Sequence, residues 1–154
     1  MDNLEIERKY LLKALPKMPA PLDVLEIEQG YVPGVKVLER VRRQVSRDGS
    51  IKYFRTVKLG VGVQRMEFED ETDQRIFEHL WVLTVGARVR KRRYVVPNGA
   101  DHWEIDEFTD RPLALAELEI ARADSAIVFP DWLRPVLVRE VTDEPEYTNR
   151  SLAR

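Results

Sequence analysis

The sequence has no cysteine and only two histidines among its 154 residues. Without cysteine, disulfides, thiolate metal ligands and a cysteine nucleophile are excluded. Two histidines are too few for a metal site of three imidazoles, and a Ser/His/Asp triad would depend on His79 or His102, both of which we expect to be structural or solvated residues. Any chemistry must therefore use Asp, Glu, Lys, Arg and Tyr side chains.

The sequence also lacks an apolar run close to the roughly 20 residues that span a bilayer. It begins Met1-Asp2-Asn3-Leu4-Glu5, which is acidic where a secretory signal would be basic and then apolar. The 25 Lys and Arg residues are balanced by 27 Asp and Glu residues, so no global basic field favours nucleic acid. We expect a cytoplasmic protein with no membrane partner and no nucleic-acid partner.

The sequence is rich in charged residues, and its length fits one domain. Hydrophobic residues make up 44% and charged residues 34%, so a packed core is possible although the charge content is high. The sequence contains no repeat, no low-complexity segment and no linker. We therefore expect a single domain over residues 1–154.

Apolar and polar residues alternate with a period of two along most of the chain, which is typical of strands with two different faces. The alternation predicts strands at 3–12, 23–32, 35–46, 51–60, 62–69, 87–97, 102–109 and 114–122. The best hairpin signal is Arg47-Asp48-Gly49-Ser50. Between residues 70 and 83 the spacing is helical, with Thr72 or Asp73 as N-cap, and a second helical patch interrupted by prolines follows at 124–138. About eight strands in so short a chain favour a barrel or a strongly curled sheet.

Charged side chains form a row on one face of strand after strand. The rows contain Glu5, Glu7, Lys9, Arg40, Arg42, Lys52, Lys58, Arg65, Glu67, Glu69, Lys91, Arg93, Glu104, Asp106, Glu117 and Glu119. Neighbouring like charges repel unless something of opposite sign binds between them. If the strands close on one another, the rows can face a shared lumen whose carboxylates suit Mg²⁺ or Mn²⁺ and whose bases suit a polyanion. The alternative for any single row is an ordinary solvent-exposed face.

Several motifs resemble the CYTH superfamily, the triphosphate tunnel metalloenzymes, and they occur in the family's order. Glu5-Ile6-Glu7-Arg8-Lys9 is similar to its ExExK signature. The other matches are Gln29-Gly30-Tyr31, Arg40-Val41-Arg42, Thr56-Val57-Lys58, Arg65-Met66-Glu67-Phe68-Glu69, Lys91-Arg92-Arg93-Tyr94, Trp103-Glu104-Ile105-Asp106 and Ala116-Glu117-Leu118-Glu119, followed by Glu140-Val141-Thr142, Tyr147-Thr148-Asn149 and Ser151-Leu152-Ala153. The resemblance covers nearly the whole chain.

The resemblance implies a mainly β (α+β) fold, an eight-stranded antiparallel closed β-barrel that forms a tunnel, with a few short helices outside. It implies a divalent metal, Mg²⁺ or Mn²⁺, and a triphosphate inside. The metal-binding acids would be Glu5, Glu7, Asp106, Glu117 and Glu119. The phosphate-binding bases would be Lys9, Arg40, Arg42, Lys58, Arg65, Lys91 and Arg93.

The expected activity is metal-dependent hydrolysis of a terminal phosphoanhydride, with inorganic tripolyphosphate as the first substrate to test. Repulsion from neighbouring cations would lower the pKa of Lys58 and let it exchange protons near neutral pH, assisted by Tyr31. The alternatives are that Lys58 only binds phosphate and that Tyr31 only packs at the wall. We expect Glu67 and Glu69 to orient basic residues instead of holding metal.

Other functions stay open at this point. The same superfamily includes an adenylate cyclase branch and thiamine triphosphatases, and a non-catalytic polyphosphate-binding protein would carry the same charged rows. A purely structural barrel, in which acidic and basic rows pair with each other, is a further alternative. The apolar outer faces, including Trp81 and Trp132, could support a homodimer or anchor helices to the barrel wall, and we favour the second.

Overall fold

The computed structural model describes residues 4–35, 37–59 and 64–154, and for residues 4, 5, 64 and 65 it describes the backbone alone. Its strands are β1 (Leu4–Leu12), β2 (Asp23–Val32), β3 (Leu38–Val45), β4 (Ile51–Leu59), β5 (Gln64–Thr72), β6 (Arg88–Asn98), β7 (Asp101–Phe108), β8 (Ala114–Glu119) and β9 (Leu137–Glu140). The helices are α1 (Gln74–Trp81) and α2 (Asn149–Leu152), with 3-10 turns at Val82–Thr84, Arg134–Val136 and Pro145–Tyr147.

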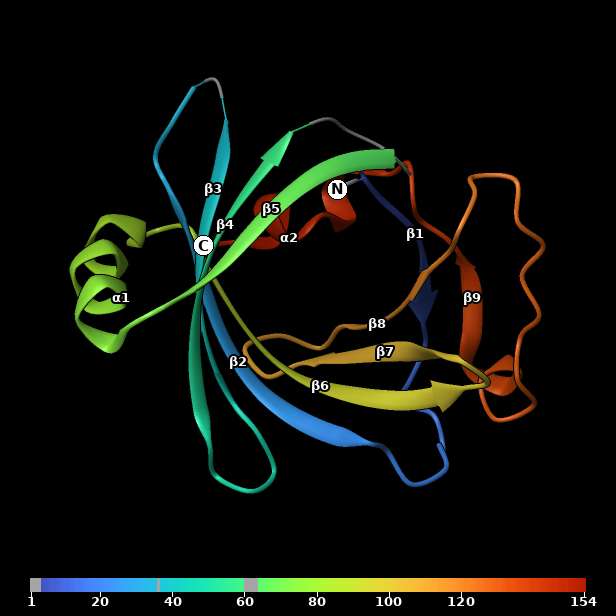
Figure 1. Cartoon of the computed structure of the whole chain (residues 1–154). Coiled ribbons are helices and arrows are strands. Elements are labelled where there is room, and N and C mark those ends of the chain that lie inside the picture. Colours follow the sequence, from blue (N-terminus) through green and yellow to red (C-terminus); the bar gives the residue numbers. More distant parts are fainter. Residues whose placement is uncertain (1–3, 36, 60–63) are drawn as a thin grey trace.

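The strands form one antiparallel sheet that curls strongly (Figure 1), in the order β5-β4-β3-β2-β6-β7-β8-β1-β9. One edge of β1 pairs with β8. The other edge pairs with β5 at Leu4, Glu5 and Ile6 and with β9 further along, at Tyr10, Leu11 and Leu12. The predicted mainly β fold with few helices is confirmed. The sheet has nine strands instead of eight, and closure into a barrel stays a prediction.

Local signals account for the element boundaries. β2 has the predicted bounds, and β3 and β4 form the predicted hairpin. In its turn the Asp48 carboxylate accepts hydrogen bonds from the backbone amide and the hydroxyl of Ser50. Gly49 has a φ of 86°, which favours glycine. The Asp73 side chain accepts a hydrogen bond from the Ile76 amide and starts α1. Of the second helical patch, expected at 124–138 and interrupted by prolines, only the 3-10 turn Arg134–Val136 forms, and β9 follows it directly.

Apolar side chains on the outer face of β1, β6, β7 and β8 form the larger core cluster. Tyr10, Trp103 and Ile105 are buried there beneath residues 120–137, including Phe129 and Trp132. At the other side of the sheet, Phe77 of α1 packs against Tyr53 and stacks on Trp81. Trp132 thus packs an outer segment against the sheet, and the Trp81 ring lies 4.2 Å from the guanidinium carbon of Arg88 in β6. The homodimer stays a prediction. Within the described residues, neither helix is long and apolar enough to cross a membrane.

The smaller core cluster lies on the inward face, at one end of the curled sheet. Leu11, Val89, Phe108 and Leu115 stand two residues from the inward charges of their strands. They are packed by the C-terminal segment, which we define as residues 141–154, through Val141, Tyr147, Leu152 and Ala153. Backbone hydrogen bonds join this segment to β1 and β6, from Val141 to Lys9 and between Arg154 and Arg88. Chain from the far end of the sequence therefore fills one end of the interior, where α2 lies in Figure 1.

Candidate functional site

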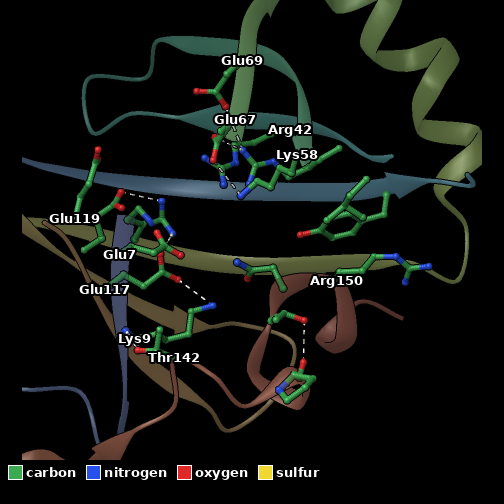
Figure 2. A pocket seen from close by; sticks show the side chains of 18 of the residues that line it. Glu7, Lys9, Arg42, Lys58, Glu67, Glu69, Glu117, Glu119, Thr142 and Arg150 are labelled. Atoms are coloured by element: carbon green, nitrogen blue, oxygen red, sulfur yellow. Dashed lines mark hydrogen bonds and ion pairs between the residues drawn. The ribbon is translucent and has the colours of Figure 1, made fainter. Parts of the chain in front are cut away.

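The inward charges of the sheet surround one cavity of about 750 Å³. Its wall combines strand residues with the C-terminal segment (Figure 2). The lining residues are Glu7, Lys9, Tyr31, Leu38, Arg40, Arg42, Lys58, Glu67, Glu69, Arg93, His102, Glu104, Glu117, Glu119, Thr142, Asp143, Glu144, Pro145, Thr148, Asn149 and Arg150. Nearly all are charged or polar, so the cavity suits a highly charged ligand.

On the β3–β5 side, basic residues are held by acidic residues of the next strand. Arg40 Nη2 lies 3.2 Å from Glu69 and 3.7 Å from Glu67, and Lys58 Nζ lies 3.3 Å from Glu67. Thr56 donates a hydrogen bond to the same Glu69 oxygen that Arg40 contacts. These contacts match the prediction that Glu67 and Glu69 orient the basic row.

Arg42 is the exception in this row. Its side chain is buried, and its Nε and Nη2 atoms both donate to the neutral Gln29 amide oxygen, at 3.0 and 2.8 Å. Burial, together with the charges of Arg40 and Arg93, outweighs the more distant carboxylates of Glu69 and Glu104 and lowers the pKa of Arg42 to about 9. Among the described residues, no carboxylate lies within ion-pair distance of it. A buried guanidinium with no carboxylate in direct contact is costly, so an anion bound beside it would be stabilising.

Tyr31 lies beside this arginine and lines the cavity, and its assistance to Lys58 stays a prediction. Its hydroxyl accepts a hydrogen bond of 3.3 Å from the Gln29 amide, so one glutamine contacts both side chains. Burial raises the pKa of Tyr31 above its ordinary value, which keeps the hydroxyl protonated at neutral pH. The backbone here is packed closely, because a Cβ on Gly30 would lie 2.5 Å from the Thr84 side chain.

Lys91 and Asp106 do not line the cavity, contrary to their predicted contact with phosphate and metal. Lys91 Nζ donates to Asp106 Oδ2 at 2.7 Å, and Arg93 donates to both Asp106 oxygens at 2.7 and 2.8 Å. Burial opposes ionisation of Asp106, but these two cations hold its pKa below the ordinary value. In this structure the carboxylate serves to fix Arg93, which does line the cavity and also donates to Glu104 at 2.8 Å.

Carboxylates oppose one another across β1, β8 and β7. Glu7 pairs in register with Glu119, and Glu117 with Glu104, although like charges directly opposite each other destabilise a sheet. Burial, Glu104 and Glu7 raise the pKa of Glu119. Burial and Glu7 also oppose ionisation of Glu117, but Lys9 and Arg93 outweigh them and lower its pKa. We call these four residues the carboxylate cluster.

The carboxylate cluster fits a divalent cation in its chemistry. The Glu117 Oε1 atom is buried and accepts no hydrogen bond in the described structure, and Lys9 Nζ lies 3.5 Å from it. Oxygen ligands of this kind are those that Mg²⁺ and Mn²⁺ prefer. In the described part of the chain, no group of three acidic or histidine side chains is arranged closely enough to hold a metal ion. The side chain of Glu5, also predicted as a ligand, lies outside the described residues.

The structure brings most of the predicted site together. Glu7, Lys9, Tyr31, Arg40, Arg42, Lys58, Arg93, Glu117 and Glu119 all line the cavity. Glu5 and Arg65 are register partners between β1 and β5, and their side chains lie outside the described residues.

Sequence reasoning missed His102, the cavity position of Glu104 and the contribution of the C-terminal segment. The alternation placed Glu104 in a charged row, so it could have been found. The tail has no strand periodicity that would indicate a cavity wall.

Comparison with known proteins gives one clear relationship. No protein-family model matches the sequence. The chain is 36% identical over 157 residues to a protein of Nitrosomonas europaea named inorganic triphosphatase, and the alignment covers 97% of this chain and 96% of that protein. A solved structure of an inorganic triphosphatase matches with a TM-score of 0.65 and 34% identity, over 96% of both chains. A conserved hypothetical protein from Pyrococcus furiosus, with a TM-score of 0.56, 19% identity and coverage of 86% and 83%, shows the fold alone.

Replacing Asp106 with Asn should destabilise the protein, because it leaves Lys91 and Arg93 buried without their shared counter-charge. We expect the Asp106→Asn variant to lose about 3–5 kcal/mol of unfolding free energy, measured by urea denaturation at pH 7. Glu28→Gln is the control, since Glu28 also bridges two arginines, Arg43 and Arg90, but on a partly exposed face. It should lose no more than about 1 kcal/mol. Equal losses would contradict the buried role of Asp106.

Replacing Glu119 with Gln should have the opposite effect on ligand-free stability. A raised folded-state pKa means that the stability contributed by Glu119 is present below its unfolded pKa and is lost as pH rises through the folded value. The Glu119→Gln variant should therefore melt at or above the wild-type temperature at pH 7 without metal, with less advantage near pH 4. A lower melting temperature at pH 7 would show that Glu119 is a stabilising ion-pair partner.

Proposed function

The chain belongs to the same family as the inorganic triphosphatase of Nitrosomonas europaea, and we propose that it is itself a divalent-metal-dependent hydrolase of inorganic tripolyphosphate. The ordered motifs of the sequence support placing this family within the CYTH superfamily. The proposal also takes the curled sheet to be a closed barrel whose lumen is the cavity, with the three β1–β5 residue pairs as its seam.

The observation that carries the proposal is Arg42. It is buried at the wall of the cavity, with Arg40 and Arg93 as the neighbouring charges that lower its pKa, and among the described residues its side chain donates only to a neutral amide. A phosphate group would supply the missing negative charge, and a guanidinium binds phosphate oxygens with two parallel hydrogen bonds. A chain of phosphates could reach several of these cations at once, which a single anion could not.

The carboxylate cluster is where we place the cation. Glu7, Glu117 and Glu119 would hold Mg²⁺ or Mn²⁺, with the Glu5 side chain as a further candidate. When bound, the cation would neutralise charge on phosphate oxygens and polarise the phosphorus centre. Its binding would also relieve the repulsion between Glu7 and Glu119, so carboxylates that destabilise the ligand-free sheet become favourable in the complex.

The chain's own residues would then act by positioning and charge. Arg40 and Lys58 are fixed by Glu67 and Glu69, and Arg93 is fixed by Asp106, so the cations are preorganised before substrate enters. Preorganised charges stabilise negative charge on the transferred phosphoryl oxygens at no further cost in reorganisation. We assign Lys58 to proton exchange with the reacting groups and Tyr31 to hydrogen bonding, since its raised pKa keeps it a donor.

The character of the wall supports an inorganic chain over a nucleotide or thiamine triphosphate. Among the described lining residues the aromatic side chains are Tyr31, which is buried at the wall, and His102. Leu38 and Pro145 are the apolar ones. A nucleobase or thiazolium ring would need a larger stacking surface than these offer.

The experiment is a phosphate-release assay with tripolyphosphate, thiamine triphosphate, ATP and pyrophosphate, each with Mg²⁺, with Mn²⁺ and with EDTA. We expect release from tripolyphosphate to be fastest and to stop in EDTA. Cyclic AMP formed from ATP would identify a cyclase instead. Metal-assisted binding of tripolyphosphate without release of phosphate would identify a non-catalytic binder, and release that continues in EDTA would contradict the metal requirement.

Replacing Arg42 with Ala should reduce kcat/KM for tripolyphosphate by two to three orders of magnitude, or about 3–4 kcal/mol of transition-state stabilisation. The adjacent Arg43 is the matched control, because its side chain points to the opposite face of β3 and pairs with Glu28 at 3.5 Å. Arg43→Ala should keep the wild-type rate. A loss below tenfold in Arg42→Ala, with an unchanged circular dichroism spectrum, would remove Arg42 from the phosphate site.

A further inference from the structure

Arg150 is a cation of the cavity wall that belongs to none of the charged strand rows. It lies on α2, within the C-terminal segment, and is labelled in Figure 2. Its guanidinium carbon lies 5.7 Å from the centroid of the Tyr31 ring, within the range of a cation–π contact. In the described part of the chain, no carboxylate lies within ion-pair distance of it.

Three cations of the wall that lie on strands each have a carboxylate within ion-pair distance. Lys9 has Glu117 at 3.5 Å, Arg40 has Glu69 at 3.2 Å and Arg93 has Glu104 at 2.8 Å. Among the described residues, Arg150 thus shares with Arg42 the lack of a carboxylate within ion-pair distance, but Arg150 is exposed whereas Arg42 is buried. A contact with an aromatic ring at an exposed site contributes little, so it can be exchanged for a stronger charged partner.

The backbone that carries Arg150 is fixed in place on both sides. The preceding residue, Asn149, accepts a hydrogen bond of 3.2 Å from Lys91 Nζ. The Thr148 hydroxyl accepts one from the Ser151 amide, and Leu152 is packed in the inward apolar cluster. Arg154 exchanges two backbone hydrogen bonds with Arg88 of β6. The Arg150 guanidinium therefore extends from a turn whose backbone is held by hydrogen bonds and packing, and this turn places it near Tyr31.

Resting on the proposed function, we propose that Arg150 is a further substrate-binding residue, which donates hydrogen bonds to the end of the polyphosphate chain that lies beside Tyr31. The strand rows bind the chain from the sheet, and Arg150 binds it from the C-terminal segment. On binding, the guanidinium exchanges its contact with the Tyr31 ring for phosphate oxygens, which it can contact with two donors at once. The wall that fills one end of the interior thereby takes part in substrate recognition.

The test compares Arg150→Ala and Arg150→Lys with Arg154→Ala. Arg154 is the matched control, since it lies in the same segment, loses the same charge and does not line the cavity. KM and kcat for tripolyphosphate with Mg²⁺ are measured at two salt concentrations, together with the rise in melting temperature caused by the same ligands. Alanine favours helix and Arg150 is exposed, so the ligand-free melting temperature should stay at the wild-type value.

We expect KM to rise about tenfold in Arg150→Ala, as for loss of a hydrogen bond to a charged group, and the ligand-induced rise in melting temperature to shrink. Arg150→Lys should lie between this variant and wild type, and Arg154→Ala should stay within twofold of wild type. A KM unchanged in Arg150→Ala, an equal loss in Arg154→Ala, or a loss confined to kcat would each overturn the assignment. The last result would show that Arg150 only supports Tyr31.

The two proposals can fail separately. If the wild-type protein binds tripolyphosphate but releases no phosphate, hydrolysis is refuted and the melting-temperature comparison still decides the role of Arg150. If the wild type releases phosphate and Arg150→Ala is indistinguishable from it, hydrolysis stands and Arg150 is refuted. If the wild type shows neither binding nor release, both proposals are wrong.

Discussion

Charged side chains can be turned toward the interior of a curled sheet only if each charge finds a partner, since a buried charge left alone costs several kcal/mol. Most of the inward charges here meet this constraint through neighbouring strands, as in the contacts of Asp106 with Lys91 and Arg93. In the described structure Arg42 donates only to the neutral Gln29 amide, and the like charges of Glu7 and Glu119 stand opposite each other in register. An anion beside Arg42 and a cation beside the two carboxylates would each be stabilised, and on this complementarity we base the proposal that the cavity binds a polyanion with a metal.

The rest of the fold follows from turning the charged faces inward. The apolar faces of β1 and β6–β8 then point outward and must be covered, which residues 120–137 do around Trp103. The interior cannot be charged throughout, because one end is filled by Leu152 and its apolar neighbours. This end fixes Lys91 through Asn149 and brings Arg150 to the wall. The C-terminal segment is therefore part of the site as well as part of the core.

Strand alternation was sufficient to predict the eight longer strands, since its period of two survives in the sequence, and it placed the charges on the correct face. Alternation shows which face of a strand a side chain lies on, but not whether that part of the strand borders the cavity. Lys91 and Asp106 were therefore predicted to contact ligand although they lie outside the cavity wall. β9 is only four residues long, follows Pro135 and pairs irregularly with β1 near Leu12, so tertiary contact defines it. The role of the tail depends on packing, for which its sequence carries no periodic signal.

The central claim is that opposed acidic and basic groups of one cavity hold a phosphate chain together with a cation. A crystal structure of the wild-type protein with tripolyphosphate and Mn²⁺, recorded at the manganese absorption edge, tests it most directly. The account predicts an anomalous peak among Glu7, Glu117 and Glu119, with phosphate density in contact with Arg42. Manganese and phosphate bound outside this cavity, with Arg42 still bonded only to Gln29, would contradict it.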